Sequence, residues 1–158
     1  MRYYPIFLNL TGKRVLVVGA GRIALRKLQG LIGSGAEITV VSPTVLPEIQ
    51  ALPGVIIIKR LFRLQDMLNV NIVYAATDDF EVNHAIGDNI QSWQWFNNTS
   101  CSKESNFYSP AIIKRGDLII GISTRNLNPV NAKKYKRKIL SFLESVDSSI
   151  KRDTPFLP

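Results

Sequence analysis

One segment near the amino terminus constrains the fold of this chain more than any other. An apolar run at residues 15–18 is followed by Gly19 and Gly21, and a small residue, Ala24, comes three positions later in a helix-compatible stretch. Glycine lets a chain turn sharply as it leaves a strand and lets a backbone approach a phosphate closely, and a small third residue lets helix and strand pack tightly. A second apolar run near residues 37–41 completes a strand–helix–strand unit. The pattern predicts a dinucleotide pyrophosphate at the helix N-terminus; the alternative is a tight turn that binds nothing.

The end of the second predicted strand bears on which dinucleotide would bind. Units of this type usually place Asp or Glu there to bind the ribose hydroxyls, whereas this chain has Ser42, Pro43 and Thr44. A serine hydroxyl can also bind a ribose, and Arg22 beside the glycine turn would favour a 2′-phosphate. The residues by themselves therefore leave NAD and NADP open.

Strand and helix patterns alternate as far as about residue 98, which predicts an α/β fold with a Rossmann-type parallel sheet. Strands are expected near residues 14–18, 38–41, 55–59, 72–76 and 93–98, and helices near residues 22–32 and 80–91. Thr77, Asp78 and Asp79 come directly after the fourth strand, where ligands of open α/β sheets bind, although Asp is also favoured as a helix N-cap. The predicted cofactor-binding residues are Gly19, Gly21, Arg22, Ile23, Ser42, Pro43, Thr44, Thr77 and Asp78.

The pattern changes after residue 109. Apolar runs at residues 111–114 and 118–123 flank a glycine-containing turn and predict a hairpin. Asn128 and Pro129 then open a helix with one apolar stripe, formed by Ala132, Tyr135, Ile139, Phe142 and Leu143. A hairpin and one helix bury little apolar surface alone, so this part must pack on the first domain or on another chain, and we expect it to form a homodimer interface. The predicted organisation is a dinucleotide-binding domain at residues 1–109, a dimerisation segment at 110–146 and a flexible tail at 147–158.

Composition narrows the setting of the chain. No apolar run approaches the roughly 18 residues that a membrane span needs, and the single cysteine, Cys101, fits a reducing cytoplasm. The net charge of +8 has its densest basic run at residues 133–138, which we interpret as a solvated helix face rather than an anion site. No nucleic-acid-binding motif is present, so nucleic acid is not an expected partner. His84 is the only histidine, and no metal site is expected.

Taken together, several blocks of sequence resemble the precorrin-2 dehydrogenase module of siroheme synthases, from about Tyr4 to Leu143. The blocks are residues 4–8, 12–19, 24 and 26–27; residues 75–79 with Asn83; and residues 107–113 with 115–116, 122–124, Pro129 and Ala132. The resemblance implies a homodimer that uses NAD to oxidise precorrin-2 to sirohydrochlorin in siroheme or related tetrapyrrole biosynthesis. Some members also insert iron, and many carry a further helical domain that would begin near the end of this chain. We therefore expect dehydrogenation rather than iron insertion.

The resemblance also indicates a catalytic position. Members of the family carry an essential Asp after the fifth strand, and alignment to Pro110 places Ser100 at this position. A serine does not act as a general base near neutral pH without help. Glu104, four residues later, is a candidate substitute base, and Asp78 and Asp79 are other carboxylates nearby. The alternative function is therefore a non-catalytic relative that binds a dinucleotide or a tetrapyrrole and serves as a carrier or partner of another tetrapyrrole enzyme.

Overall fold

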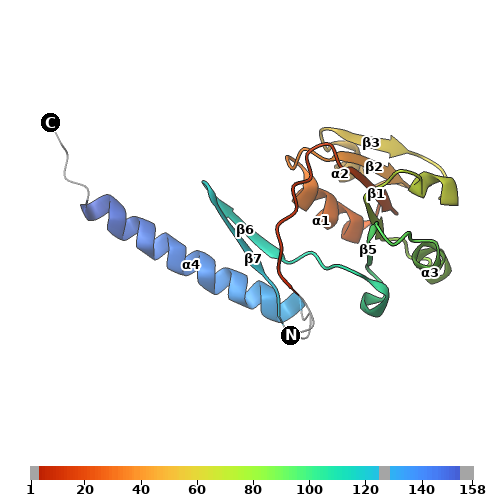
Figure 1. The fold of residues 1–158 in the computed structure, drawn as a ribbon. Helices are drawn as coiled ribbons and strands as arrows, with labels where there is room; N and C mark the ends of the chain where they lie inside the picture. Colours follow the sequence, from red (N-terminus) through yellow and green to blue (C-terminus); the bar gives the residue numbers. More distant parts are fainter. Residues whose placement is uncertain (1–3, 125–128, 154–158) are drawn as a thin grey trace. The chain divides into compact units, whose positions relative to one another are not determined.

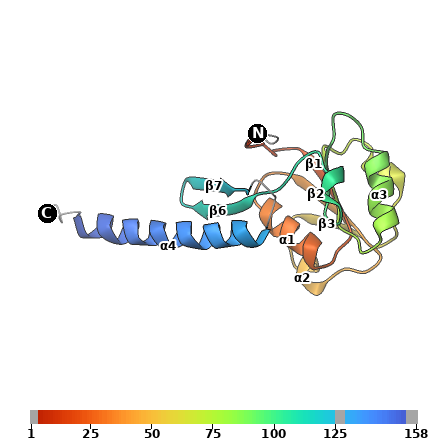
Figure 2. The same ribbon diagram turned by 90° about the horizontal axis from the view of Figure 1, so that it is seen from below.

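The computed structural model describes residues 4–124 and 129–153, and the chain divides after Tyr108 into two compact units. Figures 1 and 2 show the first unit as a sheet with helices and the second as a hairpin with one long helix. In chain order, the elements of the first unit are β1 (Arg14–Val18), α1 (Arg22–Leu31), β2 (Glu37–Val41), α2 (Pro47–Gln50), β3 (Val55–Ile58), η1 (Leu64–Met67), β4 (Ile72–Ala75), α3 (Phe80–Asp88), β5 (Trp95–Asn98) and η2 (Ser102–Glu104).

The five strands form one parallel sheet in the order β3-β2-β1-β4-β5. The strand order reverses at β1, because the chain first moves outward from β1 through β2 to β3 and then returns to add β4 on the other side. In open α/β sheets a ligand crevice forms at this reversal, outside the carboxyl ends of the strands. The predicted α/β class with a Rossmann-type parallel sheet is therefore confirmed.

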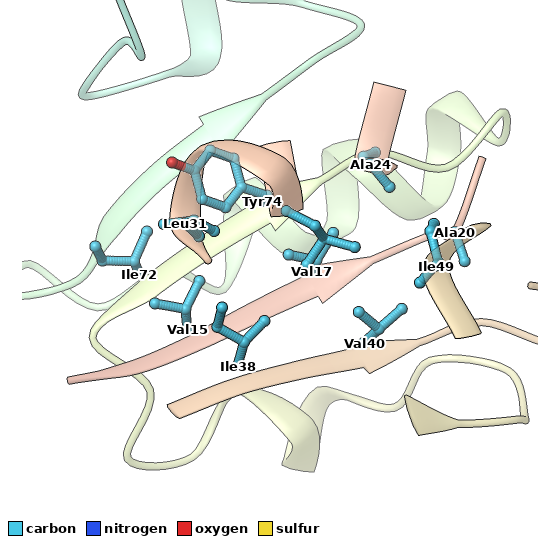
Figure 3. Packing of buried hydrophobic residues seen from close by; sticks show 12 residues of the cluster. Val15, Val17, Ala20, Ala24, Leu31, Ile38, Val40, Ile49, Ile72 and Tyr74 are labelled. Carbon is cyan, nitrogen blue, oxygen red and sulfur yellow. The ribbon is translucent and has the colours of Figure 1, made fainter. Parts of the chain in front are cut away.

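Both faces of the sheet are covered, and alternate residues of each strand serve the two cores. On one face, Val15, Val17, Ile38 and Val40 pack with Ala24 and Leu28 of α1 and with Ile49 of α2, as Figure 3 shows for part of this cluster. On the other face, Leu16, Val18, Val73 and Phe96 pack with Met67 of η1 and Ile86 of α3. A strand buried on both faces needs apolar residues at nearly every position, which explains the continuous apolar runs of β1 and β4.

Two predicted boundaries in the first unit are wrong by a few residues. Helix α3 ends at Asp88 rather than near residue 91, where Asn89 donates a side-chain hydrogen bond to the Ala85 carbonyl (2.8 Å). Strand β5 begins at Trp95 rather than at residue 93, because Gln94 closes a turn through a backbone hydrogen bond to the Gln91 carbonyl (2.9 Å). The buried Gln94 amide also donates to the carbonyls of Met67 and Val70. These local polar contacts outweigh the apolar pattern of the sequence.

The second unit contains the antiparallel strands β6 (Ala111–Arg115) and β7 (Leu118–Ile122), followed by helix α4 (Pro129–Asp153). Gly116 takes a positive φ of 57° in the tight turn between the strands. Helix α4 contacts both strands, and Ile113, Ile122 and Ala132 are buried. The predicted hairpin followed by a helix is confirmed, whereas Asn128, its expected N-cap, lies outside the described residues.

Helix α4 continues to Asp153, so the segment expected to begin a flexible tail at residue 147 is helical for its first seven residues. Neither glycine nor proline interrupts the sequence between Pro129 and Pro155, and the helix can therefore continue. Residues 154–158 lie outside the described part of the chain. Among the described helices, none combines the length and the apolar character that a bilayer crossing requires.

Candidate dinucleotide-binding site

A cleft of about 660 Å³ lies at the carboxyl ends of β1, β2 and β4, where the strand order reverses. Four segments border it: the glycine turn after β1, the loop between β2 and α2, the segment between β3 and η1, and the segment between β4 and α3. The predicted residues Gly19, Gly21, Ser42, Pro43, Thr44, Thr77 and Asp78 all line this cleft. The side chains of Arg22, Ile23 and Ser100 are exposed to solvent and are not part of its lining.

The two glycines of the turn serve different purposes. Gly19 has a φ of 98°, and a Cβ there would lie 2.3 Å from the Ala76 carbonyl oxygen at the end of β4. Its backbone N–H also donates to the Val41 carbonyl of β2 (2.9 Å). Gly21 has an ordinary φ of −87°, and a Cβ there would meet no atom within 4 Å. Gly19 therefore allows neighbouring strand ends to approach each other, whereas Gly21 leaves open space beside the helix.

The N-terminus of α1 is suited to bind an anion. No side chain of the described residues caps it, and its first turn carries no acidic residue. By contrast, the N-terminus of α3 is capped by Asp79, whose Oδ1 accepts hydrogen bonds from the backbone N–H groups of Glu81 (2.9 Å) and Val82 (3.1 Å). The first N–H groups of a helix lack partners within the helix and carry the positive end of its dipole. Arg22 and Ile23 would therefore contribute their backbone N–H groups.

The β2 side of the cleft is built around Ser42, whose side chain is buried. Its Oγ donates a hydrogen bond to the Thr44 carbonyl (2.7 Å), and its backbone N–H donates to the Ile58 carbonyl of β3 (3.2 Å). The hydroxyl proton is therefore used inside the loop, and the Ser42 oxygen remains available only as an acceptor. Leu46 donates its backbone N–H to the Ala20 carbonyl (3.2 Å), which closes this loop against the glycine turn.

Sequence reasoning missed an apolar part of the cleft lining. Leu61, Phe62 and Val82 line the cleft, and Leu61 is 74% exposed. An apolar wall suits the flat face of an adenine ring, since small-molecule sites are lined mainly by apolar side chains. A usable signal was present in the sequence, because Leu61 and Phe62 come shortly after the third strand, at the same edge of the sheet as the glycine turn.

Asp79 caps α3, as one interpretation of the sequence predicted, and Thr77 and Asp78 border the cleft. The fully buried side chain of Asn83 holds this segment in place. Its Oδ1 accepts from the Thr77 backbone N–H (3.2 Å) and hydroxyl (2.8 Å), and its Nδ2 donates to the Thr77 carbonyl (2.9 Å). The same Nδ2 group donates to Ser100 Oγ (3.2 Å). Asn83 therefore connects the cleft with the segment that follows β5.

Ser100 is held by its neighbours rather than free to act as a base. Its Oγ donates a hydrogen bond to Asn98 Oδ1 (2.7 Å). Asn98 Oδ1 also accepts hydrogen bonds from the backbone N–H groups of Ser100 (2.9 Å) and Cys101 (3.2 Å). The Ser100 hydroxyl donates its proton in a hydrogen bond to Asn98 and accepts one hydrogen bond from Asn83. One lone pair of its oxygen therefore remains to accept a hydrogen bond from a ligand.

Glu104 does not lie against the Ser100 hydroxyl as a substitute base. Its Oε2 accepts from Asn98 Nδ2 (2.8 Å), and its Oε1 lies 3.2 Å from Nδ1 of His84. The hydrogen bond from Asn98 holds the pKa of the Glu104 carboxyl below its ordinary value. Glu104 therefore fixes the orientation of the Asn98 amide. Across the residues with described positions, no group of three or more His, Cys, Asp and Glu side chains is arranged to hold a metal ion.

The sheet, the glycine turn and the open helix terminus define a Rossmann-type α/β protein of the NAD(P)-binding class. Residues 6–111 match the family described as "Putative NAD(P)-binding". The chain is 36% identical over 138 residues to a precorrin-2 dehydrogenase of Bacillus subtilis, with 85% of each protein covered. It is 38% identical over 157 residues to the precorrin-2 dehydrogenase of Priestia megaterium, with 98% of this chain and 76% of the relative covered.

The likeness extends to three dimensions. The solved structure of SirC, a precorrin-2 dehydrogenase, matches with a TM-score of 0.77 and 37% sequence identity, over 88% of this chain and 70% of that chain. The chain belongs to the precorrin-2 dehydrogenase family, as the resemblance in its sequence predicted.

Proposed function

We propose that this protein is an NAD-dependent dehydrogenase that oxidises precorrin-2 to sirohydrochlorin in siroheme biosynthesis. The observation that carries the proposal is the extent of the similarity to the two precorrin-2 dehydrogenases. It spans 85% and 98% of this chain, and it therefore reaches beyond the dinucleotide-binding unit into the hairpin and α4. Dinucleotide binding alone would not require that second part.

The described residues fit the cofactor. NAD+ supplies the hydride acceptor when it is bound. The backbone N–H groups of the first turn of α1, including Arg22 and Ile23, would bind the pyrophosphate, and Gly21 leaves the space for it. Residues 42–44 would border the adenosine ribose at the end of β2. Thr77 and Asp78 would border the other half of the cofactor, across the point where the strand order reverses.

Ser100 remains the proposed position of the catalytic side chain, and its contacts define what it can do. Oxidation by hydride transfer also releases a proton, and a hydroxyl that already donates to Asn98 is poorly suited to take that proton. Ser100 can instead accept a hydrogen bond from the substrate and help to orient it. Positioning the reactants supplies a large part of many enzymatic accelerations, so turnover does not require a base at this position.

One assay tests this function directly. The protein is incubated with precorrin-2 and NAD+, and NADH absorbance is followed together with the spectrum of the macrocycle. We expect NADH to appear as sirohydrochlorin forms. Ser100→Ala removes the acceptor and should slow turnover, whereas Ser100→Asp adds a carboxylate and should accelerate it. An unchanged rate in both variants would contradict a catalytic position at residue 100.

The Ser100 hydroxyl already donates its proton to Asn98, and this observation also supports a second candidate function. A non-catalytic relative would bind a dinucleotide or a tetrapyrrole and act as a carrier or partner of another tetrapyrrole enzyme. NAD+ binding without any turnover of precorrin-2, in both the wild-type protein and the Ser100→Asp variant, would favour this alternative over the dehydrogenase.

The second unit supports the proposal that the protein works as a homodimer. Leu118, Ile119, Tyr135 and Phe142 are all exposed, at 40%, 51%, 56% and 65% respectively. Tyr135 and Phe142 are seven residues apart and therefore lie on one side of α4. Sedimentation should show a dimer that Phe142→Ser weakens, whereas Ile56→Ser, at an exposed apolar position of the first unit, should not. A monomer at micromolar concentration would contradict the proposal.

We further propose that the protein acts in the cytoplasm. The single cysteine supports this location. One cysteine forms no disulfide within the chain, and proteins of reducing compartments rarely carry disulfides. Fractionation of the cells that make the protein should recover it with the cytosolic fraction, and recovery in an oxidising compartment would contradict the proposal.

A further inference from the structure

The charges that border the cleft bear on which dinucleotide it selects. The described residues that line the cleft include two carboxylates, Asp78 and Asp79, and no Lys, Arg or His. This is unexpected in a chain with a net charge of +8. NADP+ differs from NAD+ by a 2′-phosphate on the adenosine ribose, and sites that accept this phosphate usually supply an arginine. The cleft therefore has room for a dinucleotide but no lining cation for the additional phosphate.

Arg60 is the candidate for this role, because it directly precedes two residues of the cleft lining, Leu61 and Phe62. Arg60 follows β3 by two residues, and its backbone N–H donates to the Ile58 carbonyl (3.1 Å). The same carbonyl accepts from the backbone N–H of Ser42, where the adenosine ribose would lie. The next residues, Leu61 and Phe62, line the cleft. Arg60 therefore lies beside the adenosine end of the cleft without contributing to its lining.

Asp66 of η1 engages this guanidinium through both of its oxygens. Nη1 of Arg60 donates to Oδ2 of Asp66 (2.8 Å), and Nη2 donates to Oδ1 (2.6 Å). Nη1 also donates to the Leu61 carbonyl (3.0 Å), and Asp66 Oδ2 accepts from the backbone N–H of Arg63 (2.9 Å). Two-point pairing of Arg with a carboxylate fixes the plane of the guanidinium as well as its charge. The Asp66 side chain is 11% exposed, so solvent competes little for it.

The carboxylate that pairs with Arg60 lies outside the lining of the cleft. Asp66 lines a separate, smaller groove over β1, β2 and β3, together with Ile56 and Ile58, and it is not part of the cleft lining. Other cations near the adenosine end are placed differently. Lys59 donates to Gln50 (3.2 Å), and Arg22 begins α1 beside the glycine turn rather than at the ends of β2 and β3.

We propose that Asp66 determines the cofactor specificity of this cleft, because it binds the Arg60 guanidinium and thereby denies it to the 2′-phosphate of NADP+. The inference rests on the proposed function, since it requires a nicotinamide dinucleotide in the cleft. Arg60 would supply the cation for a 2′-phosphate, and its pairing with Asp66 prevents this contact. The cleft consequently binds NAD+ in preference to NADP+.

Calorimetric titration of the full chain with NAD+ and with NADP+ tests the proposal. The wild-type protein should bind NAD+ more tightly. Asp66→Asn keeps the shape of the side chain and removes its charge, which frees the guanidinium. We expect NADP+ affinity to rise about tenfold, the effect of one charge-assisted contact, while NAD+ affinity changes less than about twofold. The double variant Arg60→Gln/Asp66→Asn should lose this gain.

Two further variants serve as controls. Glu37→Gln breaks the exposed ion pair between Arg14 and Glu37 at the other end of the sheet (3.5 Å) and should leave the ratio of the two affinities unchanged. Arg60→Gln alone should also leave the ratio unchanged, because the guanidinium is already occupied; this variant tests the idea even if Asp66→Asn folds poorly. A fall in NADP+ affinity in Arg60→Gln would contradict the proposal.

The outcomes also separate this inference from the proposed function. An unchanged ratio in Asp66→Asn, with NAD+ binding intact, would overturn the role of Asp66 alone. Equal affinity of the wild-type protein for NAD+ and NADP+ would do the same. Failure of the wild-type protein to bind either dinucleotide would overturn the proposed function and the specificity inference with it.

Discussion

Replacing Gly19 and Gly21 by alanine, one at a time, should affect different properties. The Gly19 variant should lose stability, and the Gly21 variant should lose affinity for NAD+. At Gly19 a Cβ would lie 2.3 Å from the Ala76 oxygen, 2.6 Å from the Ala76 carbonyl carbon and 2.8 Å from the Thr77 nitrogen. All three are backbone atoms of the segment that leaves β4, and they cannot move aside as a flexible side chain would. The φ of 98° at Gly19 adds strain for any residue with a Cβ.

The cost at Gly19 follows from these two contributions. Overpacking in a well-packed region costs roughly 1–3 kcal/mol, and a positive φ in a residue with a Cβ costs roughly 1–2 kcal/mol. Gly19→Ala should therefore lower the free energy of unfolding by about 2–5 kcal/mol, a large part of the roughly 5–15 kcal/mol typical of folded domains. For a chain of this size, the midpoint of thermal unfolding should fall by about 4–20 °C.

Gly21 is the matched control, because alanine there meets no atom within 4 Å and adopts an ordinary φ. Its loss as an N-cap residue should cost less than about 1 kcal/mol, whereas its new methyl group would occupy the proposed path of the pyrophosphate. We expect Gly21→Ala to unfold close to the wild-type temperature and to bind NAD+ at least about tenfold more weakly, the equivalent of about 1.4 kcal/mol.

Thermal unfolding followed by circular dichroism and calorimetric titration with NAD+ measure the two effects separately. If Gly19→Ala melts at the wild-type temperature, the close approach of β1 and β4 is not what requires glycine there. If Gly21→Ala binds NAD+ with unchanged affinity, the pyrophosphate does not lie against the N-terminus of α1.

Further substitutions test the core, the polar contacts after β5 and the ion pair at the end of β3. Leu28→Ala removes a fully buried side chain and should lower the free energy of unfolding in urea by about 2–5 kcal/mol. Asn98→Ala removes the acceptor shared by Ser100 and Cys101 and should cost about 2–3 kcal/mol by the same measurement, since each hydrogen bond contributes roughly 1 kcal/mol. The hydrogen bond from Arg60 holds the pKa of Asp66 below its ordinary value of 3.8, so the ionised carboxylate stabilises the folded state at neutral pH and this stabilisation is lost as the pH falls below that value. Asp66→Asn should therefore show a shallower loss of stability between about pH 5 and pH 2 in urea titrations, and a wild-type slope would contradict this coupling.

Local sequence was sufficient to predict most elements of the fold. The apolar runs that became β1 and β4, the glycine turn and the hairpin around Gly116 are each specified by neighbours in the chain. Strands buried on both faces and turns that need a positive φ leave strong local patterns, because few residue types satisfy them. The position of the cleft followed as well, since the carboxyl ends of parallel strands lie along one edge of a sheet.

Element ends were less predictable because single polar contacts decide them, and some of these contacts join residues that are far apart in the chain. The turn at Gln94 delays β5, and the Gln94 amide also donates hydrogen bonds to Met67 and Val70, which are more than twenty residues away. The contacts of Ser100 depend on Asn83, seventeen residues earlier. Neither pairing leaves a periodic trace in the sequence, because each involves single polar side chains.

The sequence alone therefore determined the class of fold, the order of its elements and the presence of a dinucleotide-type turn, since these depend on local periodicity and on backbone freedom. Only the tertiary structure showed that a side chain at Gly19 would collide with the end of β4. It also decided which residue accepts the hydrogen bond of the Ser100 hydroxyl and which carboxylate pairs with the Arg60 guanidinium. Each of these depends on atoms that come within a few ångströms of one another only when separate strands are placed in one sheet.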